Sequence, residues 1–310
     1  MKRGVLIALS GGLASVVFYL AFRTNAAGVL ILTYLTPLPI LLVGLSKGLH
    51  FGVIAAALAI TIILFTTGPV ATSLYCILVA VPVVIIIRQF LINRPAAAVG
   101  QIEWYPPGLI LSWLTAYGIV LITAVTIYFS GDEGGISGIS KRLLNEAFSI
   151  VMNVNPSITT PIDRIAAFLP GMLISVWLLI LILNATLAQN FLSKIGYSKR
   201  PPPLYREIEL PQWLTIGLAL SILLSFASGV SSEIGRNSAP LLSIPFFLLG
   251  LTVIHTLSRR VSARGLVLVG AYILLVVVGW ISAIIVLLGV LEQWVSLRSK
   301  FAQPKQNSGE

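Results

Sequence analysis

TYLTPLPILLVGLSKGLHFGVIAAA, residues 33–57, is the stretch that decides the fold. Pro37 and Pro39 interrupt its apolar run, and because proline lacks a backbone donor, the helix there must break or kink. In a membrane, an opened backbone is tolerated only where protein or a watery cavity receives it. The stretch is therefore the candidate functional centre, and Thr36, Pro37 and Pro39 are candidate substrate-lining residues.

Small residues recur at every fourth position in two places. Gly44, Gly48 and Gly52 follow the prolines, and Ala8 and Gly12 lie in the first apolar run. On a helix such residues share one face and let another backbone approach closely. We expect helix packing or partner docking at these five positions, and the spacing leaves open whether the neighbouring helix belongs to this chain.

The composition excludes a single soluble fold. The 310 residues are 57% hydrophobic and 10% charged, whereas soluble domains carry about 25% charged residues. The net charge of +10 comes from Lys and Arg in short loops between apolar runs, which topology explains better than nucleic acid does. We predict an all-α, polytopic transmembrane helical bundle whose partner is the lipid bilayer.

A spanning helix needs about 20 mostly apolar residues. The segments that qualify are 4–22, 28–46, 49–67, 70–88, 107–129, 166–190, 212–230, 239–258 and 265–291. The first exceeds the roughly 7–15 residues of a signal-peptide core, so we expect an uncleaved span. Loop Lys and Arg place the N-terminus in the cytoplasm. Nine spans would put the basic tail outside and eight would return it inside, so the expected count is eight or nine.

The apolar runs define the expected organisation of the chain. A six-span front unit covers 1–198 and includes an external loop, 130–165, with the helical spacing of an interfacial amphipathic helix. A Pro-rich linker follows at 199–211, because three consecutive prolines make a stiff extended spacer. A rear unit of two or three spans covers 212–291, and 292–310 is a polar tail.

Polar residues within the predicted spans are few. No Asp, Glu, Lys or Arg lies in the middle of any of them, which disfavours a proton pump or a channel with a charged filter. Asn184 is deep enough to need a partner, either another helix or a ligand. We therefore add Asn184 to the candidate substrate-lining residues.

No motif predicts an enzyme. Residues 44–48, GLSKG, match the nucleophile elbow of serine hydrolases, but an apolar helical run precedes them where the elbow needs a strand, and a tight turn explains the same letters. No phosphate-cradling loop for ATP and no acidic cluster suited to magnesium occurs. We expect no catalytic residue, no cofactor and no metal, and the single cysteine, Cys76, permits no disulfide within the chain.

Four short segments resemble the YybS-like family of predicted bacterial membrane proteins of unknown function. They are YLTPLPI at 34–40, the glycine pair at 44 and 48, LPQW at 210–213 and GVLEQWVSLR at 289–298. That family in turn looks like the substrate-binding S components of energy-coupling-factor transporters. The resemblance implies a six-span solute-binding unit in the bacterial plasma (inner) membrane, an ATPase supplied by a partner, and docking of that partner at Ala8 and Gly12.

Two hypotheses follow. The first is a small-solute-binding, transport-related membrane subunit that lacks its own ATPase. The alternative is a non-transporting scaffold or assembly protein that acts through helix–helix contacts with a membrane protein partner or as a homo-oligomer. Nothing in the sequence points to nucleic acid.

Overall fold

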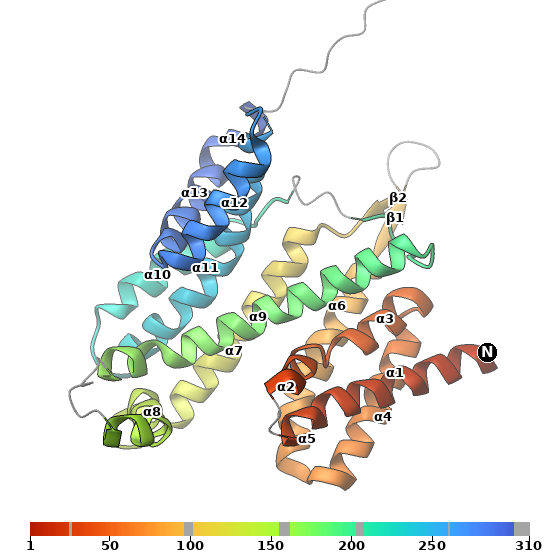
Figure 1. Ribbon diagram of the computed structural model, residues 1–310, viewed down its shortest axis with the longest axis horizontal. Coiled ribbons are helices and arrows are strands. Elements are labelled where there is room, and N and C mark those ends of the chain that lie inside the picture. The colour runs from red at the N-terminus through yellow and green to blue at the C-terminus, as the bar shows by residue number, and fades with distance from the viewer. Residues whose placement is uncertain (25–26, 96–101, 155–161, 203–207, 260, 301–310) are drawn as a thin grey trace, which may run out of the picture. The chain divides into compact units, whose positions relative to one another are not determined.

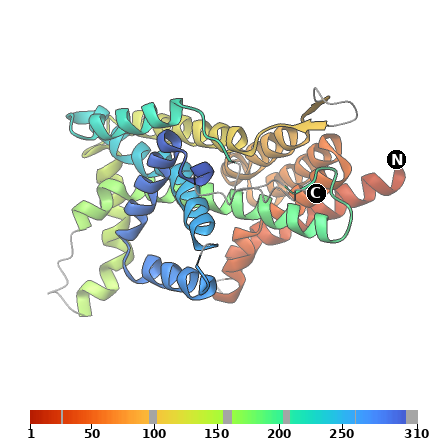
Figure 2. The same ribbon diagram turned by 90° about the horizontal axis from the view of Figure 1, so that it is seen from above.

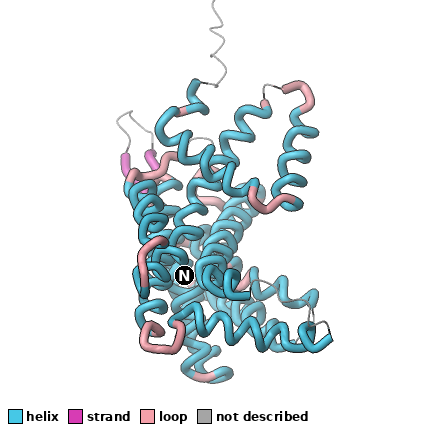
Figure 3. Tube along the Cα trace, turned by 90° about the vertical axis from the view of Figure 1, so that its left-hand side faces the viewer, coloured by secondary structure: helices cyan, strands magenta, loops and turns pink. Residues whose placement is uncertain are grey.

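Helices make up almost all of the described structure. The structure, a computed structural model, describes residues 1–24, 27–95, 102–154, 162–202, 208–259 and 261–300. Within these ranges the strands are β1 (Asn93–Pro95) and β2 (Ile102–Trp104), which form one small antiparallel hairpin (Figure 3, magenta). The prediction of an essentially all-α chain is confirmed.

The chain folds into two compact units, each made of two separate stretches. Unit 1 comprises residues 1–110 and 179–203, and unit 2 comprises 111–178 and 204–310. Two helices contribute residues to both units, α7 (Pro107–Tyr128) and α9 (Ile162–Lys194). The sequence division into 1–198 and 212–291 followed the order of the chain, whereas the fold groups 111–178 with the rear helices.

Unit 1 is built around α1 (Lys2–Leu20), which packs against α3 (Leu38–Lys47) and α4 (Leu49–Thr67) (Figure 1). Its remaining helical elements are η1 (Ala21–Thr24), α2 (Ala27–Tyr34), α5 (Pro69–Tyr75), the π-helical turn η2 (Cys76–Ala80) and α6 (Val81–Leu91). Elements α5, η2 and α6 form one continuous apolar helix, Pro69–Leu91. Residues 44–47 of GLSKG form the last turn of α3, and Gly48 alone, at φ +112°, separates α3 from α4, so the predicted tight turn is confined to this glycine.

Glycines let the helices of unit 1 come close together. A Cβ at Gly12 would lie 2.6 Å from the Ala55 carbonyl oxygen of α4. A Cβ at Gly52 would lie 2.9 Å from the Ile87 side chain of α6, which also fills the space beside Gly44. At Gly12, Gly44 and Gly52 the spacing therefore corresponds to packing between helices of this chain, and Ala8 is fully buried within the same unit. Gly48 differs, because it lies between α3 and α4 and a Cβ there would meet only Lys199 Nζ, at 3.2 Å.

Unit 2 consists of four helices from the rear of the chain, the adjoining parts of α7 and α9, and α8 (Gly135–Val154). The rear helices are α10 (Trp213–Ser225), α11 (Gly229–Ser258), α12 (Arg264–Val277) and α13 (Ile281–Val295), followed by the short α14 (Leu297–Lys300). Helix α11 packs most extensively, against α10 and α13. Figure 2 shows α12 leading from the end of α11 to the start of α13.

The helix lengths refine the predicted spans. Six helical segments are long and apolar enough to cross a membrane: 2–23, 49–67, 69–91, 107–128, 162–194 and 229–258. Four shorter apolar helices cover 31–47, 213–225, 264–277 and 281–295. The predicted total of eight or nine spans is not confirmed, and the segment 265–291, predicted as one span, is two helices separated at Val278–Trp280.

One further segment differs from the prediction, and one predicted helix is present. Residues 231–238, predicted as a loop, form the start of α11, so Glu233 lies inside a helix. The amphipathic helix predicted in the 130–165 loop is present as α8. Residues 155–161 of that loop, 203–207 of the Pro-rich linker and 301–310 of the tail lie outside the described residues.

Candidate functional site

The candidate site is the break between α2 and α3. Helix α2 ends at Tyr34, residues 35–37 form a turn, and α3 begins at Leu38 with Pro39 in its first turn. Because Pro37 and Pro39 have no N–H, carbonyl oxygens of the preceding turn lose their usual helical donors. The predicted break is confirmed, and Thr36, Pro37 and Pro39 are all buried.

Side chains of α1, α9 and the turn itself bind three carbonyls around the break. Asn184 of α9 donates through Nδ2 to the Tyr34 carbonyl at 2.8 Å. Ser15 of α1 donates to the Thr36 carbonyl at 2.8 Å. The Thr36 hydroxyl donates to the Thr33 carbonyl at 2.7 Å. Protein therefore surrounds the break, as the low polarity of a membrane interior requires.

A buried tyrosine completes this polar cluster. The Tyr75 hydroxyl, on the last residue of α5, lies 2.8 Å from the Ser15 hydroxyl, and Tyr75 is fully buried. Tyr19 of α1 packs edge-on against the Tyr75 ring at 5.2 Å between ring centres. The cluster thus links α1, the broken helix, α5 and α9 through neutral groups.

Two oxygen atoms in this region have no hydrogen-bond partner in the described structure: Asn184 Oδ1 and Thr33 Oγ1. Asn184 is fully buried, and its Nδ2 donates to two carbonyl oxygens, those of Tyr34 and Ile180, both at 2.8 Å. Since carbonyls can only accept, this amide orientation is fixed, and Oδ1 remains an unused acceptor. Buried polar groups are usually paired, so this oxygen marks the place where a donor would be bound.

Sequence reasoning located the break and Asn184 but missed Ser15 and Tyr75. Serine within a span usually bonds its own helix, as Ser46 does to the Leu42 carbonyl at 2.6 Å, so Ser15 carried no distinguishing signal. Tyr75 lies in an apolar run, and no local pattern indicated that its hydroxyl would face a polar partner. Gly44 lies on α3, Gly48 between α3 and α4, and Gly52 on α4.

Unit 2 has polar contacts of its own that the sequence did not reveal. Glu233 of α11 accepts the Ser137 N–H at 3.2 Å at the start of α8, where the helix dipole favours a negative charge. Asn237 accepts the Gly171 N–H at 2.8 Å, directly after Pro170 in α9. Both side chains use their acceptors to hold helix backbones, which is a structural role.

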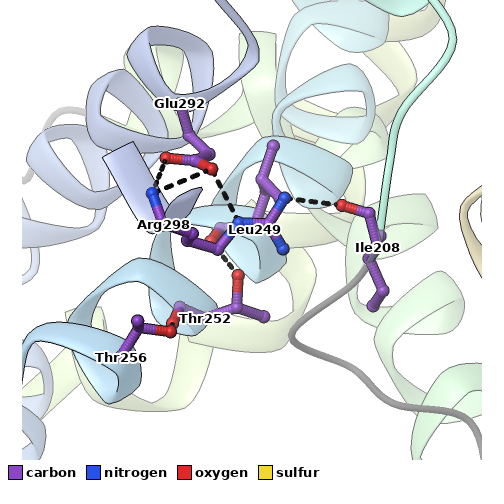
Figure 4. Close-up of polar contacts among 6 residues, drawn as sticks. All are labelled: Ile208, Leu249, Thr252, Thr256, Glu292 and Arg298. Carbon is purple, nitrogen blue, oxygen red and sulfur yellow. Dashed lines mark hydrogen bonds and ion pairs between the residues drawn. The ribbon is translucent and has the colours of Figure 1, made fainter. Parts of the chain in front are cut away.

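A buried ion pair in unit 2 joins Glu292 of α13 to Arg298 of α14 (Figure 4). The Glu292 carboxylate accepts from Arg298 Nε at 2.7 Å and from the Arg298 backbone N–H at 3.1 Å. Arg298 also donates to the Ile208 carbonyl at 2.8 Å. The pair fastens the segment before α10 to the end of α13.

Among the described residues, no group of three or more His, Cys, Asp or Glu side chains could hold a metal ion.

The comparisons with known proteins give one family. Residues 12–292 match the model of a family described as "Predicted membrane protein (DUF2232)". The chain belongs to this family. The match spans the broken helix, both units and the rear helices, and it agrees with the YybS-like resemblance seen in the sequence motifs.

No curated protein matches the chain, and no solved structure does. The family description fixes the chain as a predicted membrane protein and assigns no substrate.

Proposed function

We propose that this DUF2232 protein is the solute-binding membrane subunit of a transport system, and that the solute binds at the break between α2 and α3. The observation that carries the proposal is the buried, unused Oδ1 of Asn184 beside a helix break. Many membrane transporters bind their substrates beside discontinuous helices, and here the unpaired groups at the break are side-chain oxygens. The site lies in unit 1, within the part that resembles S components.

The chemistry of the break indicates the class of solute. The unpaired atoms described there are Asn184 Oδ1 and Thr33 Oγ1, and none of the described hydrogen bonds at the break involves a charged side chain. A small neutral molecule that presents N–H or O–H donors would satisfy the acceptor at no cost in buried charge. The proposal includes no catalytic step, and a partner protein supplies the energy for transport.

The proposal is tested by mass spectrometry of small molecules that copurify with the full-length protein in mild detergent. Asn184→Leu and Thr33→Val each remove one unpaired oxygen, and both should lower retention of the solute by tenfold or more, as loss of a buried hydrogen bond of about 1.5 kcal/mol predicts. Ser15→Ala is the matched control, because it disturbs the same break without removing either oxygen. Equal retention by all four proteins, or no copurifying molecule, contradicts the proposal.

The alternative, a membrane scaffold, needs free helix surfaces. The glycine faces first considered for it are occupied by helices of unit 1, whereas α12 has no buried residue. The scaffold therefore predicts a stable oligomer or a copurifying membrane protein that contacts α12. Docking of a partner at Ala8 and Gly12 stays a prediction, which crosslinking from neighbouring exposed positions of α1 would check.

A further inference from the structure

A small apolar pocket lies among α11, α12 and α13, entirely within unit 2. Its lining includes Leu251 and His255 from α11, Leu268, Tyr272 and Leu275 from α12, and Ile285 from α13. The one hydrogen bond described at this pocket joins His255 Nε2 to the Tyr272 hydroxyl at 2.9 Å. The pocket lining is thus apolar except for the hydrogen-bonded side chains of His255 and Tyr272.

Positive charge lies at one end of this pocket. Arg259 follows His255 by four residues, and Arg264 precedes Leu268 by four, so each arginine continues a helical row that lines the pocket. Both arginines are exposed, and neither takes part in an ion pair with any other described residue. The pocket therefore has an apolar interior and a cationic mouth where α11 connects to α12.

The surroundings of the pocket are also apolar. Helix α12 has no buried residue, and its outward side chains include Leu266, Val269, Ile273 and Val276, all more than half exposed. In a bilayer, the exposed side chains of such a helix contact lipid acyl chains. A lipid tail can reach the pocket directly from the hydrocarbon, whereas a soluble solute would have to cross it.

We propose that this pocket binds an anionic phospholipid. One acyl chain enters between α11, α12 and α13 by displacing side chains of the exposed helix α12, because the pocket as described encloses only about 10 Å³. The phosphate lies against Arg259 and Arg264 with the His255–Tyr272 pair beneath it. Charge complementarity selects this occupant, because basic pockets between transmembrane helices on the cytoplasmic side bind anionic headgroups. The site is separate from the break proposed for solute binding, and its occupant is a membrane component.

The test is native mass spectrometry of the full-length protein titrated with phosphatidylglycerol or with phosphatidylcholine of the same chain length. Wild type should prefer phosphatidylglycerol. Arg259→Gln/Arg264→Gln should weaken phosphatidylglycerol binding by more than tenfold, since each basic residue near anionic lipid contributes a factor of about five, and should leave phosphatidylcholine binding unchanged. Ala271→Phe, which fills the pocket, should weaken binding of both lipids.

Arg23→Gln/Arg142→Gln is the matched control, because it removes the same charge from exposed arginines that do not line the pocket. It should change phosphatidylglycerol binding by less than twofold. Equal losses in the two double variants would show a general charge effect and overturn the proposal. Displacement of the lipid by inorganic phosphate alone would show an anion site without a lipid site and overturn it as well.

Discussion

Single side chains decide whether a broken helix can be buried in this protein. Asn184 and Ser15 come from α9 and α1, and each donates to one carbonyl at the turn between α2 and α3, those of Tyr34 and Thr36. The sequence showed that Asn184 needs a partner because a lone amide in a long apolar run is costly to leave unpaired. It could not show whether that partner is a helix or a ligand; the structure pairs Nδ2 with the Tyr34 carbonyl and leaves Oδ1 without a partner among the described residues.

The two glutamate–arginine pairs differ in burial, and their stabilities should differ accordingly. Glu292→Gln removes the charge that Arg298 faces in a site where the glutamate side chain is 4% exposed. We expect a loss of about 3 kcal/mol in the free energy of unfolding, because a buried charge is left without its counter-ion. Glu103→Gln, in the exposed pair with Arg94, should have no measurable effect. Thermal unfolding in detergent compares the variants, and equal shifts would contradict the prediction.

The exposed pair still affects proton binding. Arg94 Nε donates a hydrogen bond to the Glu103 carboxylate at 2.8 Å, and the positive charge of Arg94 also stabilises the negative carboxylate. Both effects hold the pKa of the Glu103 carboxyl below its ordinary value. A lowered folded-state pKa means that the pair is intact above the ordinary pKa and is lost as pH falls through the lowered one. NMR titration of the labelled carboxyl should show this lowered pKa, and Arg94→Gln should return it to the ordinary range. An unchanged pKa in that variant would contradict the assignment.

At the scale of elements, the sequence predicted helix breaks only where a residue forbids the helix. Pro37 and Pro39 made the break between α2 and α3 predictable, whereas Val278–Trp280 separates α12 from α13 without a proline. The four-residue glycine spacing likewise predicted close helix contacts but not which helices make them, because a local sequence pattern does not specify the distant segment that packs against it. Ile87, which fills the space at Gly44 and Gly52, comes from an unremarkable apolar run.

Glycine substitutions should separate packed from free helix faces. Gly12→Ala places a Cβ 2.6 Å from the Ala55 carbonyl oxygen, so α1 must move, and we expect a cost of about 1–3 kcal/mol in unfolding free energy. Gly270→Ala is the control, because a Cβ there meets nothing within 4 Å. It should stabilise the protein by about 0.5–1 kcal/mol through helix propensity. Thermal unfolding of both variants in one detergent makes the comparison, and destabilisation by Gly270→Ala would contradict it.

At the scale of the whole molecule, we expect both ends of the chain on one side of the membrane if each of the ten apolar helices among the described residues crosses it. Six are long enough to span and four are shorter, and α12 and α13 replace the single predicted span 265–291. Ten crossings would return the basic tail to the side of the N-terminus and remove the conflict that nine spans create with the positive-inside rule. The four shorter helices would be about 20–25 Å long at 1.5 Å per residue, so their crossing would require the bilayer to thin locally.

Cysteine labelling tests this topology in a Cys76→Ser background. Trp280→Cys, in the turn between α12 and α13, should react with a membrane-impermeant maleimide from the outer side, and Lys300→Cys should react only after the membrane is opened. Asp132→Cys is the outer-side control. A nine-span chain would bury position 280 within a span and expose position 300 outside, so position 300 would react in intact membranes and position 280 would not react.

The 150-residue separation between Asn184 and its acceptor at Tyr34 has a consequence for biosynthesis. At about 5–20 residues per second, the ribosome reaches Asn184 roughly 8–30 seconds after it has passed the proline-rich segment. During that interval the opened carbonyls have entered the membrane without their final donor. The insertion machinery or bound water must solvate them until α9 arrives, so a chain stopped before residue 184 should be a substrate for membrane quality-control proteases.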